Sequence, residues 1–332
     1  MRVGIVGLGR IGGVHLEAWK SIPEAEVVAV CDTFLTGRRR ARTEGVLAYT
    51  DLERMLDSEQ LDAVSVCTPP ADHAEVVTAC LNKGVHVLCE KPLAVTTWDA
   101  LTMLHAASRR RRQLLLATKF RHVQEWALAS ERLASGELGD PITFEISFCS
   151  PVDMSRRWNS LPHRSGGGVI IDNGCHAFDL ASFLFGAVKR VNAVLLKPLQ
   201  QLSVEDSATI QVQVGDGVIG RIDLSWSLGV CRDSYLVVHG SRGTLEVGWK
   251  VSRLQLTGRD WETIGGPYDK LTAQRCMHLW FLDAISSQRE GWISARECLR
   301  TVAAVDAAYR SLQSDGWEWV EVKGILERRT GT

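Results

Sequence analysis

The 332-residue chain lacks the features that place a protein in a membrane, on nucleic acid or in a secretory route. No apolar stretch is long enough to cross a bilayer. The formal net charge of −1 gives no long-range attraction for nucleic acid or for an anionic membrane surface. The first residues lead directly into an apolar segment, without the charged region, long apolar core and cleavage site of a signal peptide. We therefore expect a cytoplasmic protein that binds neither nucleic acid nor membrane.

The cysteines lack the spacing of a metal or disulfide framework. There are nine of them, scattered along the chain, and no two have CxxC spacing. Cys31, Cys67 and Cys89 lie inside apolar runs. Free cysteine is among the most buried residue types, so we interpret these residues as small hydrophobic side chains in a reducing compartment. We expect no structural metal. The chain also shows no internal repeat and no low-complexity segment.

The length suggests about two domains, and the pattern of apolar residues changes near Lys119. Before that residue, apolar strands alternate with amphipathic helices, which is typical of a doubly wound parallel sheet. We expect strands at 3–6, 27–31, 63–67, 85–89 and 114–117, and helices at 11–20, 37–43, 71–83 and 98–112, with a helical turn at 52–56. Residues 1–119 are therefore predicted to form a Rossmann domain of the α/β class.

The remaining residues, 120–332, favour an α+β domain with a large, mostly antiparallel open sheet. Many of its segments have the alternation or β-branched content of strands, and Asp216-Gly217 between two of them indicates a hairpin. We expect strands at 142–147, 188–196, 208–214, 218–226, 234–239, 244–247, 251–256 and 317–322, and helices at 123–135, 169–184, 273–288 and 295–312.

A glycine-rich motif stands at the start of the chain, where VGIVGLGRIGG follows the first methionine and arginine. It joins a predicted strand to a predicted helix. Gly7 allows a tight turn, Gly9 lets the backbone approach a pyrophosphate, and Gly12 lets the helix pack close to the strand. The N–H groups at the helix start, near Arg10 and Ile11, would face the phosphates. The motif predicts a dinucleotide site; a non-binding remnant of the same fold is the alternative.

The residues after the second predicted strand bear on the choice between NAD and NADP. Asp32 ends that strand, twenty residues after Gly12. A carboxylate at this place suits a ribose diol and repels a 2′-phosphate, which favours NAD. The basic run Arg38–Arg40 lies just beyond and could meet a 2′-phosphate, although a solvated helix face is the simpler interpretation.

Glu90 and Lys91 end another predicted strand, at the edge where a doubly wound sheet holds its cofactor. A lysine there can donate a hydrogen bond to a substrate oxygen, and desolvation or a neighbouring charge can lower its pKa. The alternative is an ordinary surface lysine in a loop. Both residues are candidate cofactor contacts, and Lys91 is a candidate catalytic residue.

A rigid turn follows the strand before that one. Thr68 and Pro69 begin it, and His73 lies a few residues further on. The turn could line the nicotinamide side of the crevice, so these three residues are candidate cofactor contacts. His73 could equally be a residue at a helix start with no chemical role.

The segment GGGVIIDNGCHAFD, residues 166–179, carries three polar groups at helical spacing. Asp172 and His176 are four residues apart and Asp179 lies three further on, so one continuous helix would place them on one face. Asp172 could orient His176 and raise its pKa, which suits proton transfer near neutral pH. A His–Asp pair that only fastens the helix is the structural alternative. Metal ligation is disfavoured because no matching His/Cys cluster accompanies the helix.

These motifs, in this order and spacing, resemble the Gfo/Idh/MocA family, the glucose–fructose oxidoreductase and inositol dehydrogenase group. The resemblance covers nearly the whole chain, and the EKP and DxGxH motifs are its most specific elements. It implies a Rossmann domain followed by a sheet-containing domain. It also implies a homodimer or homotetramer formed through that second sheet, and a cis peptide between Lys91 and Pro92.

The same resemblance implies hydride transfer between NAD and a secondary alcohol or ketone of a sugar, nucleotide sugar or (amino)cyclitol. Lys91 would anchor and polarise the reacting oxygen. His176 would donate or accept the proton, and Asp172 would bind a substrate hydroxyl and support the histidine. Asp179 matches a position that helps to hold the polyol in inositol dehydrogenases.

Two weaker candidates for substrate contacts are Arg121 and Trp158. An aromatic ring can stack on a sugar face, although a tryptophan more often belongs to a core or an interface. Two other functions stay open at this point. One is an NAD-dependent glycoside hydrolase of the same fold, which oxidises its substrate transiently. The other is a non-catalytic sensor that binds a dinucleotide.

Overall fold

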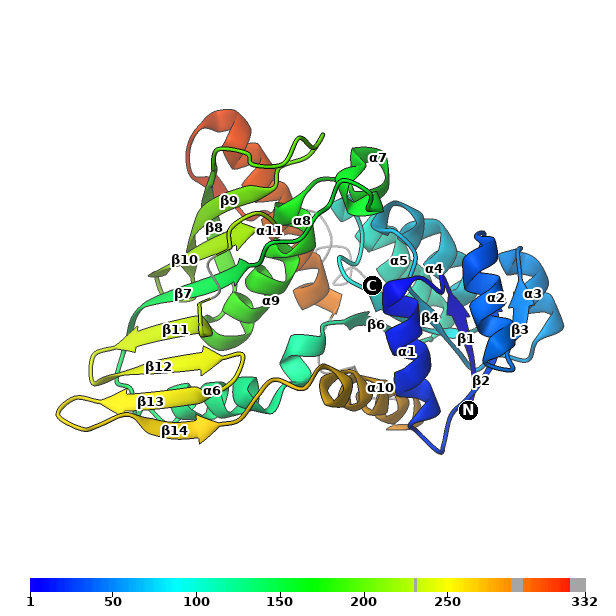
Figure 1. Ribbon diagram of the computed structural model, residues 1–332, viewed down its shortest axis with the longest axis horizontal. Helices are drawn as coiled ribbons and strands as arrows, with labels where there is room; N and C mark the ends of the chain where they lie inside the picture. The colour runs from blue at the N-terminus through cyan, green and yellow to red at the C-terminus, as the bar shows by residue number, and fades with distance from the viewer. Residues whose placement is uncertain (230–231, 288–294, 323–332) are drawn as a thin grey trace, which may run out of the picture. The chain divides into compact units, whose positions relative to one another are not determined.

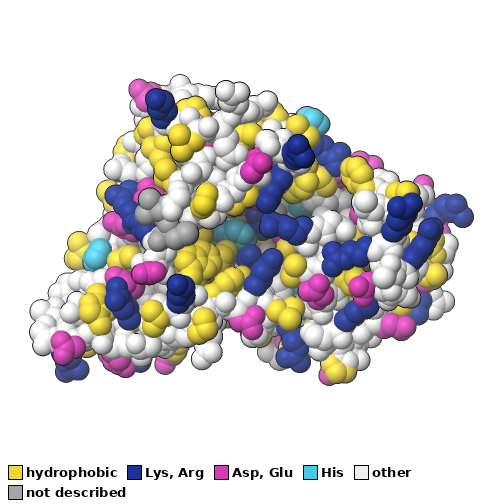
Figure 2. Space-filling model, viewed as in Figure 1, with side chains coloured by type: hydrophobic (Ala, Val, Ile, Leu, Met, Phe, Trp, Pro, Cys, Tyr) yellow, Lys and Arg dark blue, Asp and Glu magenta, His cyan; other side chains and the backbone are white. Residues whose placement is uncertain are grey.

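The computed structural model describes residues 1–229, 232–287 and 295–322, and its elements are drawn in Figure 1. The chain divides into two units: unit 1 is Met1–Lys119 with Lys270–Cys298, and unit 2 is Phe120–Asp269 with Leu299–Thr332. Among the described residues, no helix is long and apolar enough to span a membrane. Basic and acidic side chains are interspersed on the face shown in Figure 2.

Unit 1 contains a six-stranded sheet in the order β3-β2-β1-β4-β5-β6, and each neighbouring pair is parallel. The strands are β1 (Arg2–Val6), β2 (Glu26–Cys31), β3 (Leu47–Tyr49), β4 (Ala63–Val66), β5 (His86–Glu90) and β6 (Leu114–Ala117). The helices between them are α1 (Arg10–Lys20), α2 (Leu35–Thr43), α3 (Leu52–Ser58), α4 (His73–Asn82) and α5 (Thr97–Arg110), with a 3₁₀ turn η1 (Pro70–Asp72) before α4. The central strands are buried along almost their whole length, as expected when helices cover both faces of a parallel sheet. The predicted doubly wound sheet is confirmed.

Helix α10 (Lys270–Ser287) belongs to unit 1, although it comes late in the chain. Its buried Met277 and Phe281 join Trp19 of α1 in one hydrophobic cluster. The His278 ring lies edge-on to the Trp19 ring, with the two centroids 4.5 Å apart. The sequence pattern placed this helix in the second domain, because periodicity shows that a helix exists but not which sheet it covers.

Unit 2 contains a nine-stranded sheet in the order β14-β13-β12-β11-β7-β10-β9-β8-β15. The strands are β7 (Pro141–Cys149), β8 (Val188–Leu195), β9 (Ser207–Val214), β10 (Val218–Ser225), β11 (Ser234–Gly240), β12 (Gly243–Gly248), β13 (Ser252–Leu256), β14 (Glu262–Gly265) and β15 (Glu318–Trp319). Only the pairing of β10 with β7 is parallel among these described strands. The predicted large, mostly antiparallel sheet is therefore confirmed.

One face of this sheet is packed and the other is open. In β7, Phe144 and Ile146 are fully buried, whereas Glu145 and Ser147 between them are partly exposed. This alternation is expected of a sheet with one side against a core. Helix α9 (Gly174–Phe185) packs against strands on the buried face. The other helices are α6 (Gln124–Ala134), α7 (Pro162–Ser165), α8 (Val169–Asp172) and α11 (Ala295–Ser314), with 3₁₀ turns η2 (Lys119–His122) and η3 (Trp158–Ser160).

The helix predicted over residues 169–184 is wrong as a single element, because α8 and α9 are separate and meet at Asn173. Asn173 keeps a right-handed backbone conformation (φ −90°, ψ −32°), so the interruption is only one residue long. Its side chain donates a hydrogen bond to the main-chain oxygen of Phe148 on β7, at 3.3 Å. The residue that separates the two helices is therefore the one that is hydrogen-bonded to the sheet.

The packing of α10 can be tested at Phe281. We expect Phe281→Ala to lower the free energy of unfolding by about 3–5 kcal/mol, because it opens a cavity in a fully buried cluster. Arg275→Ala, at an exposed position of the same helix, should change it by about 0.5 kcal/mol at most. Urea denaturation measures both. Equal, small effects would contradict the placement of α10 in unit 1.

Candidate active site

The glycine-rich loop after β1 has the shape that a pyrophosphate requires. Gly7 has φ +87°, which favours glycine, and a Cβ there would come within 2.8 Å of the Cys67 main-chain oxygen. A Cβ on Gly12 would come within 2.0 Å of the Gly7 main-chain oxygen, so only glycine lets α1 lie this close to β1. A Cβ on Gly9 would meet no atom within 4 Å, so the loop has open space there. The residues fit a bound dinucleotide, with its phosphates at the amino-terminal end of α1 that begins at Arg10 and Ile11.

Asp32 joins this loop to the end of β2. Its Oδ2 accepts a hydrogen bond from Leu8 N at 2.7 Å, and its Oδ1 accepts one from Phe34 N at 2.7 Å. Each carboxylate oxygen can accept a further bond, so a ribose hydroxyl can still be held. Arg38 donates to the main-chain oxygen of Asp32 at 2.8 Å. The Arg38 guanidinium is therefore engaged with the backbone of the turn, instead of being directed at a 2′-phosphate, which supports the preference for NAD.

His73 fastens the turn after β4 to the segment after β5. It is fully buried, and its Nδ1 lies 2.9 Å from the Pro92 main-chain oxygen while its Nε2 lies 3.0 Å from that of Thr68. Burial lowers the pKa of His73, and these main-chain oxygens oppose that shift. The hydroxyl of Thr68 is buried and has no hydrogen-bond partner within the described part of the chain. The Thr68 hydroxyl is thus a buried polar group in this turn, whereas His73 shapes the turn.

Glu90 is the last residue of β5, and its carboxylate contacts both His15 and the backbone of Lys91. Its Oε1 lies 3.0 Å from Nε2 of the fully buried His15, and its Oε2 accepts a bond from Lys91 N at 3.1 Å. Burial raises the pKa of Glu90, but the His15 bond and the charges of Lys91 and Lys119 outweigh it, so the pKa is lowered. The peptide between Lys91 and Pro92 is cis, as the resemblance implied.

Lys119, which the sequence pattern indicated only as a domain boundary, lies among the charged groups at this end of the sheet. It follows β6, the strand that pairs with β5, and so leaves the sheet at the same edge as Lys91. Burial lowers the pKa of Lys119 to about 8; Glu90 opposes the shift, and Lys270, Lys91 and Arg10 add to it. Its position beyond an apolar strand was the signal that could have identified it.

In unit 2, the glycine run before α8 permits a close contact with Glu205, in the connection between β8 and β9. One carboxylate oxygen of Glu205 accepts bonds from Gly168 N at 2.9 Å, Ile170 N at 3.1 Å and the Tyr309 hydroxyl at 2.8 Å. A Cβ on Gly168 would come within 2.0 Å of the Glu205 main-chain oxygen. The start of α8, which leads to Asp172, is thereby fixed.

Asp172 and His176 lie on different helices, on either side of Asn173. Asp172 is the last residue of α8 and is partly buried, while His176 lies in the first turns of α9 with 9% of its surface exposed. The Cys175 thiol donates to the Asp172 main-chain oxygen at 3.2 Å. The His176 ring lies edge-on to the Phe120 ring, with centroids 5.0 Å apart and an interplanar angle of 87°.

Phe120 is the centre of an aromatic cluster beside His176. Its ring is in contact with those of Phe148, Tyr235, Trp249 and Tyr268 in addition to His176. The Tyr268 hydroxyl is buried without a hydrogen-bond partner among the described residues. Trp158, the predicted aromatic contact, lies on η3 and is 40% exposed. No periodic pattern in the sequence indicates this cluster, because its rings come from segments distant in the chain.

Arg121 and Asp179, both predicted as substrate contacts, bind one another. Arg121 Nε donates to Asp179 Oδ2 at 2.9 Å and its Nη2 donates to Oδ1 at 2.7 Å. Each residue is only 2% exposed. The guanidinium also lies over the Phe183 ring, 5.2 Å from its centroid. This is a buried bidentate ion pair, the strong geometry for these two groups.

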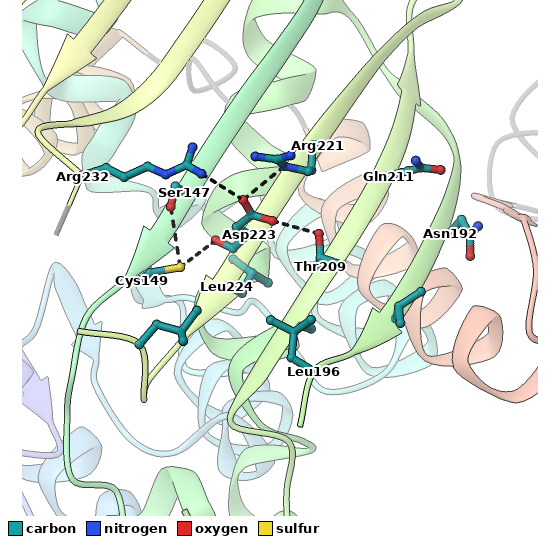
Figure 3. Close-up of a pocket in the computed structure, with 13 residues that line it drawn as sticks. Ser147, Cys149, Asn192, Leu196, Thr209, Gln211, Arg221, Asp223, Leu224 and Arg232 are labelled. Atoms are coloured by element: carbon teal, nitrogen blue, oxygen red, sulfur yellow. Dashed lines mark hydrogen bonds and ion pairs between the residues drawn. The ribbon is translucent and has the colours of Figure 1, made fainter. Parts of the chain in front are cut away.

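A separate hollow of about 700 Å³ lies on the open face of the unit 2 sheet. Figure 3 shows the Asp223 carboxylate between Thr209 and Arg221 in this hollow. Thr209 Oγ1 donates to Asp223 Oδ1 at 2.8 Å, and Arg221 Nε lies 3.2 Å from Oδ2. None of the predicted catalytic residues lines this hollow.

The parallel sheet, the glycine-rich loop and the Asp32 turn of unit 1 are typical of a dinucleotide-binding Rossmann domain. Residues 1–118 match the model of the Gfo/Idh/MocA oxidoreductase family with its NAD-binding Rossmann fold, and residues 126–246 match the model of the family's C-terminal domain. The chain belongs to the Gfo/Idh/MocA family of NAD-binding oxidoreductases.

Named relatives support this assignment. The chain is 29% identical to D-apiose dehydrogenase of Paraburkholderia graminis, over 97% of this chain and 89% of the relative. It is 30% identical to myo-inositol 2-dehydrogenase of Thermotoga maritima, over 74% of each chain. A crystal structure of GenD2 from gentamicin A biosynthesis, in complex with NAD, is 25% identical, with a TM-score of 0.86 and 97% of each chain covered.

The acid sensitivity of unit 2 can be predicted from His122, which ends η2. Burial, and then the charge of Arg121, lower the pKa of His122 from 6.5 to about 4. Between these values the unfolded chain binds more protons than the folded one, so stability falls as pH decreases from 6.5 towards 4. The fall attributable to His122 is about 2–3 kcal/mol. Urea denaturation at pH 7 and pH 4.5 should therefore show a smaller difference for His122→Gln than for the wild type. If the free energy of unfolding changed equally between pH 7 and pH 4.5 in the two proteins, His122 would not be the source of the acid sensitivity.

Proposed function

We propose that the protein transfers hydride between NAD and a secondary alcohol or ketone of a sugar, nucleotide sugar or (amino)cyclitol, with Lys91 and His176 acting at the reacting oxygen. The observation that carries the proposal is the edge formed by β5 and β6. There the buried carboxylate of Glu90 accepts a hydrogen bond from the backbone N–H of Lys91, at the end of β5. The relatives named for D-apiose and myo-inositol support a polyhydroxylated substrate.

Each side chain has a distinct role in this proposal. Bound NAD supplies the hydride acceptor. The Lys91 ammonium donates a hydrogen bond to the carbinol oxygen and stabilises the negative charge that develops there. The His176 imidazole accepts the hydroxyl proton in oxidation and returns it in reduction. Asp172 holds a neighbouring substrate hydroxyl and supports the histidine. Trp158 and the Thr68 hydroxyl are proposed contacts of the substrate and the cofactor, respectively.

Two other functions can be separated from this one by a single assay. A glycoside hydrolase of the same fold oxidises its substrate only transiently, so it would cleave a glycoside without accumulating NADH. A sensor would bind NAD and produce neither change. The presence of Lys91, Asp172 and His176 together favours an enzyme over a sensor. Mixing the protein with NAD and a panel of sugars, polyols and glycosides, and following NADH absorbance and glycoside cleavage, distinguishes all three.

The role of His176 leads to a direct prediction. We expect His176→Ala to lower kcat by about 10²–10⁴-fold, the usual contribution of a general acid–base group. NAD affinity, measured by calorimetry, should stay within about twofold, because the cofactor residues belong to unit 1. His239→Ala, at an exposed histidine of unit 2, is the matched control and should leave kcat unchanged. Full activity of His176→Ala would sink the proton-transfer assignment.

We further propose that the open face of the unit 2 sheet joins two copies of the chain in a homodimer or homotetramer. The hydrophobic side chains of Val194 and Ile219 are 51% and 44% exposed there. Arg221 pairs with Glu145 at 3.0 Å on the same face. Apolar groups mixed with both charge signs suit a self-complementary contact between identical surfaces. The cytoplasmic location stays a prediction.

The oligomer can be tested by sedimentation. We expect the wild type to sediment as a dimer or tetramer, and Val194→Arg to sediment as a smaller species, because it buries a charge at the contact. Leu47→Arg, at a 56% exposed residue of unit 1, should leave the assembly intact. A monomeric wild type, or a Val194→Arg variant that assembles as the wild type does, would contradict this interface.

A further inference from the structure

The turn η2 contacts α9 at two places that are one helical turn apart. Phe120 lies against His176 with a centroid distance of 5.0 Å, and the next residue, Arg121, binds Asp179 through two hydrogen bonds. Positions three apart on a helix share a face. Two consecutive residues of η2 therefore hold the face of α9 that carries His176.

The charges in this contact are engaged with each other. Both carboxylate oxygens of Asp179 receive an N–H of the Arg121 guanidinium, at 2.7 and 2.9 Å. Both side chains are almost completely buried, at 1% and 3% exposure. The guanidinium continues along α9 to the ring of Phe183, four residues beyond Asp179. Arg121 thus spans two positions of the helix, and the planar fork of an arginine is suited to fix their orientation.

We propose that Phe120, Arg121 and Asp179 are positioning residues that fix the His176 imidazole, and that Asp179 does not hold the substrate. This inference rests on the proposed function and departs from the role that the resemblance implies for Asp179. A carboxylate that contacted a polyol would need an oxygen open to the site. Here both oxygens are bound by the Arg121 guanidinium, and the Asp179 side chain is only 3% exposed, so neither oxygen is open to a polyol.

The physical reason for such a contact is the precision that proton transfer demands. An imidazole must lie within hydrogen-bond reach of the hydroxyl proton that it accepts. A displacement of about 1 Å can cost about 100-fold in rate without any loss of binding groups. His176 stands only a few residues after the break at Asn173, so α9 needs support from another element there. The η2 contact supplies that support.

The test replaces the ion pair by apolar groups of similar size. Removing one partner leaves an uncompensated buried charge, whereas an apolar pair can preserve the fold. For the double variant Arg121→Met/Asp179→Leu, we expect a thermal midpoint close to the wild type. We also expect a kcat lower by about 10–100-fold, with KM values for NAD and for the sugar within about threefold of the wild type. The single variant Arg121→Lys keeps the positive charge but should also have a kcat below that of the wild type, because a lysine cannot make the two-point contact with Asp179.

A matched control is the ion pair of Arg132 and Glu137, which lie 2.8 Å apart at the end of α6. Arg132→Met/Glu137→Gln should leave kcat and KM unchanged. Two outcomes with the Arg121/Asp179 variant would overturn the inference. An unchanged kcat in a folded protein would assign the pair to stability alone. A sugar KM raised tenfold or more with little change in kcat would assign Asp179 to substrate binding.

A second measurement needs no turnover, so it separates this inference from the proposed function. The ring proton signals of His176 can be assigned in an NMR spectrum by their loss in His176→Ala. The edge-on Phe120 ring shifts these signals, and the double variant is expected to move them away from their wild-type position. Signals that stay in place would contradict the inference. Absence of NADH production by the wild type with every substrate would contradict only the proposed function.

Discussion

A buried charge is stable in a protein only when another group compensates it, and this constraint shapes both units. In unit 1, the Glu90 carboxylate lies against His15 and the backbone of Lys91. In unit 2, the Asp179 carboxylate lies against Arg121. In both places the compensated pair lies next to a residue proposed to act on the substrate. We infer that the cost of burying these charges is offset by the fixed position they give to Lys91 and His176.

Backbone geometry adds a second constraint. Gly12 lets α1 approach the loop after β1, and Gly168 lets the chain approach Glu205, at positions where any Cβ would overlap a main-chain oxygen. These glycines are used for close approach rather than for flexibility. The amino-terminal end of α1 and the start of α8 are both placed by such contacts. The end of α1 is the proposed place of the cofactor phosphates, and α8 leads to Asp172, a residue proposed to act in the reaction.

The sequence allowed most of the fold to be predicted, because periodicity records which face of an element is buried. The strands that it missed, β3 and β14, are short, and β14 consists of exposed or partly exposed residues. The break at Asn173 gave no signal, since asparagine occupies an ordinary helical conformation there. The placement of α10 in unit 1 depends on contacts between Phe281 and the α1 cluster. Such contacts leave no local trace in the sequence.

The residues of the candidate site also fall into two groups, those that the order of strands predicts and those that only contacts between distant segments reveal. Groups that follow a strand in sequence, such as Lys91 and Asp32, could be assigned to the cofactor edge from the order of strands alone. Arg121 and Asp179 were identified as polar residues of interest, but their pairing joins positions 58 residues apart and could not be read from spacing. Lys119 follows a strand, as Lys91 does, but it was overlooked because the charges that act on it, such as Glu90 and Lys270, come from distant parts of the chain.

Whether Lys91 and His176 act on one oxygen, as proposed, can be decided by a crystal structure of the protein with NADH and a sugar that it oxidises. We expect the Lys91 Nζ atom and an imidazole nitrogen of His176 to lie within about 3.2 Å of the same carbinol oxygen. We also expect the carbon bearing this oxygen to face the nicotinamide. A substrate whose reacting oxygen contacts neither side chain, or only one of them, would contradict this proposal.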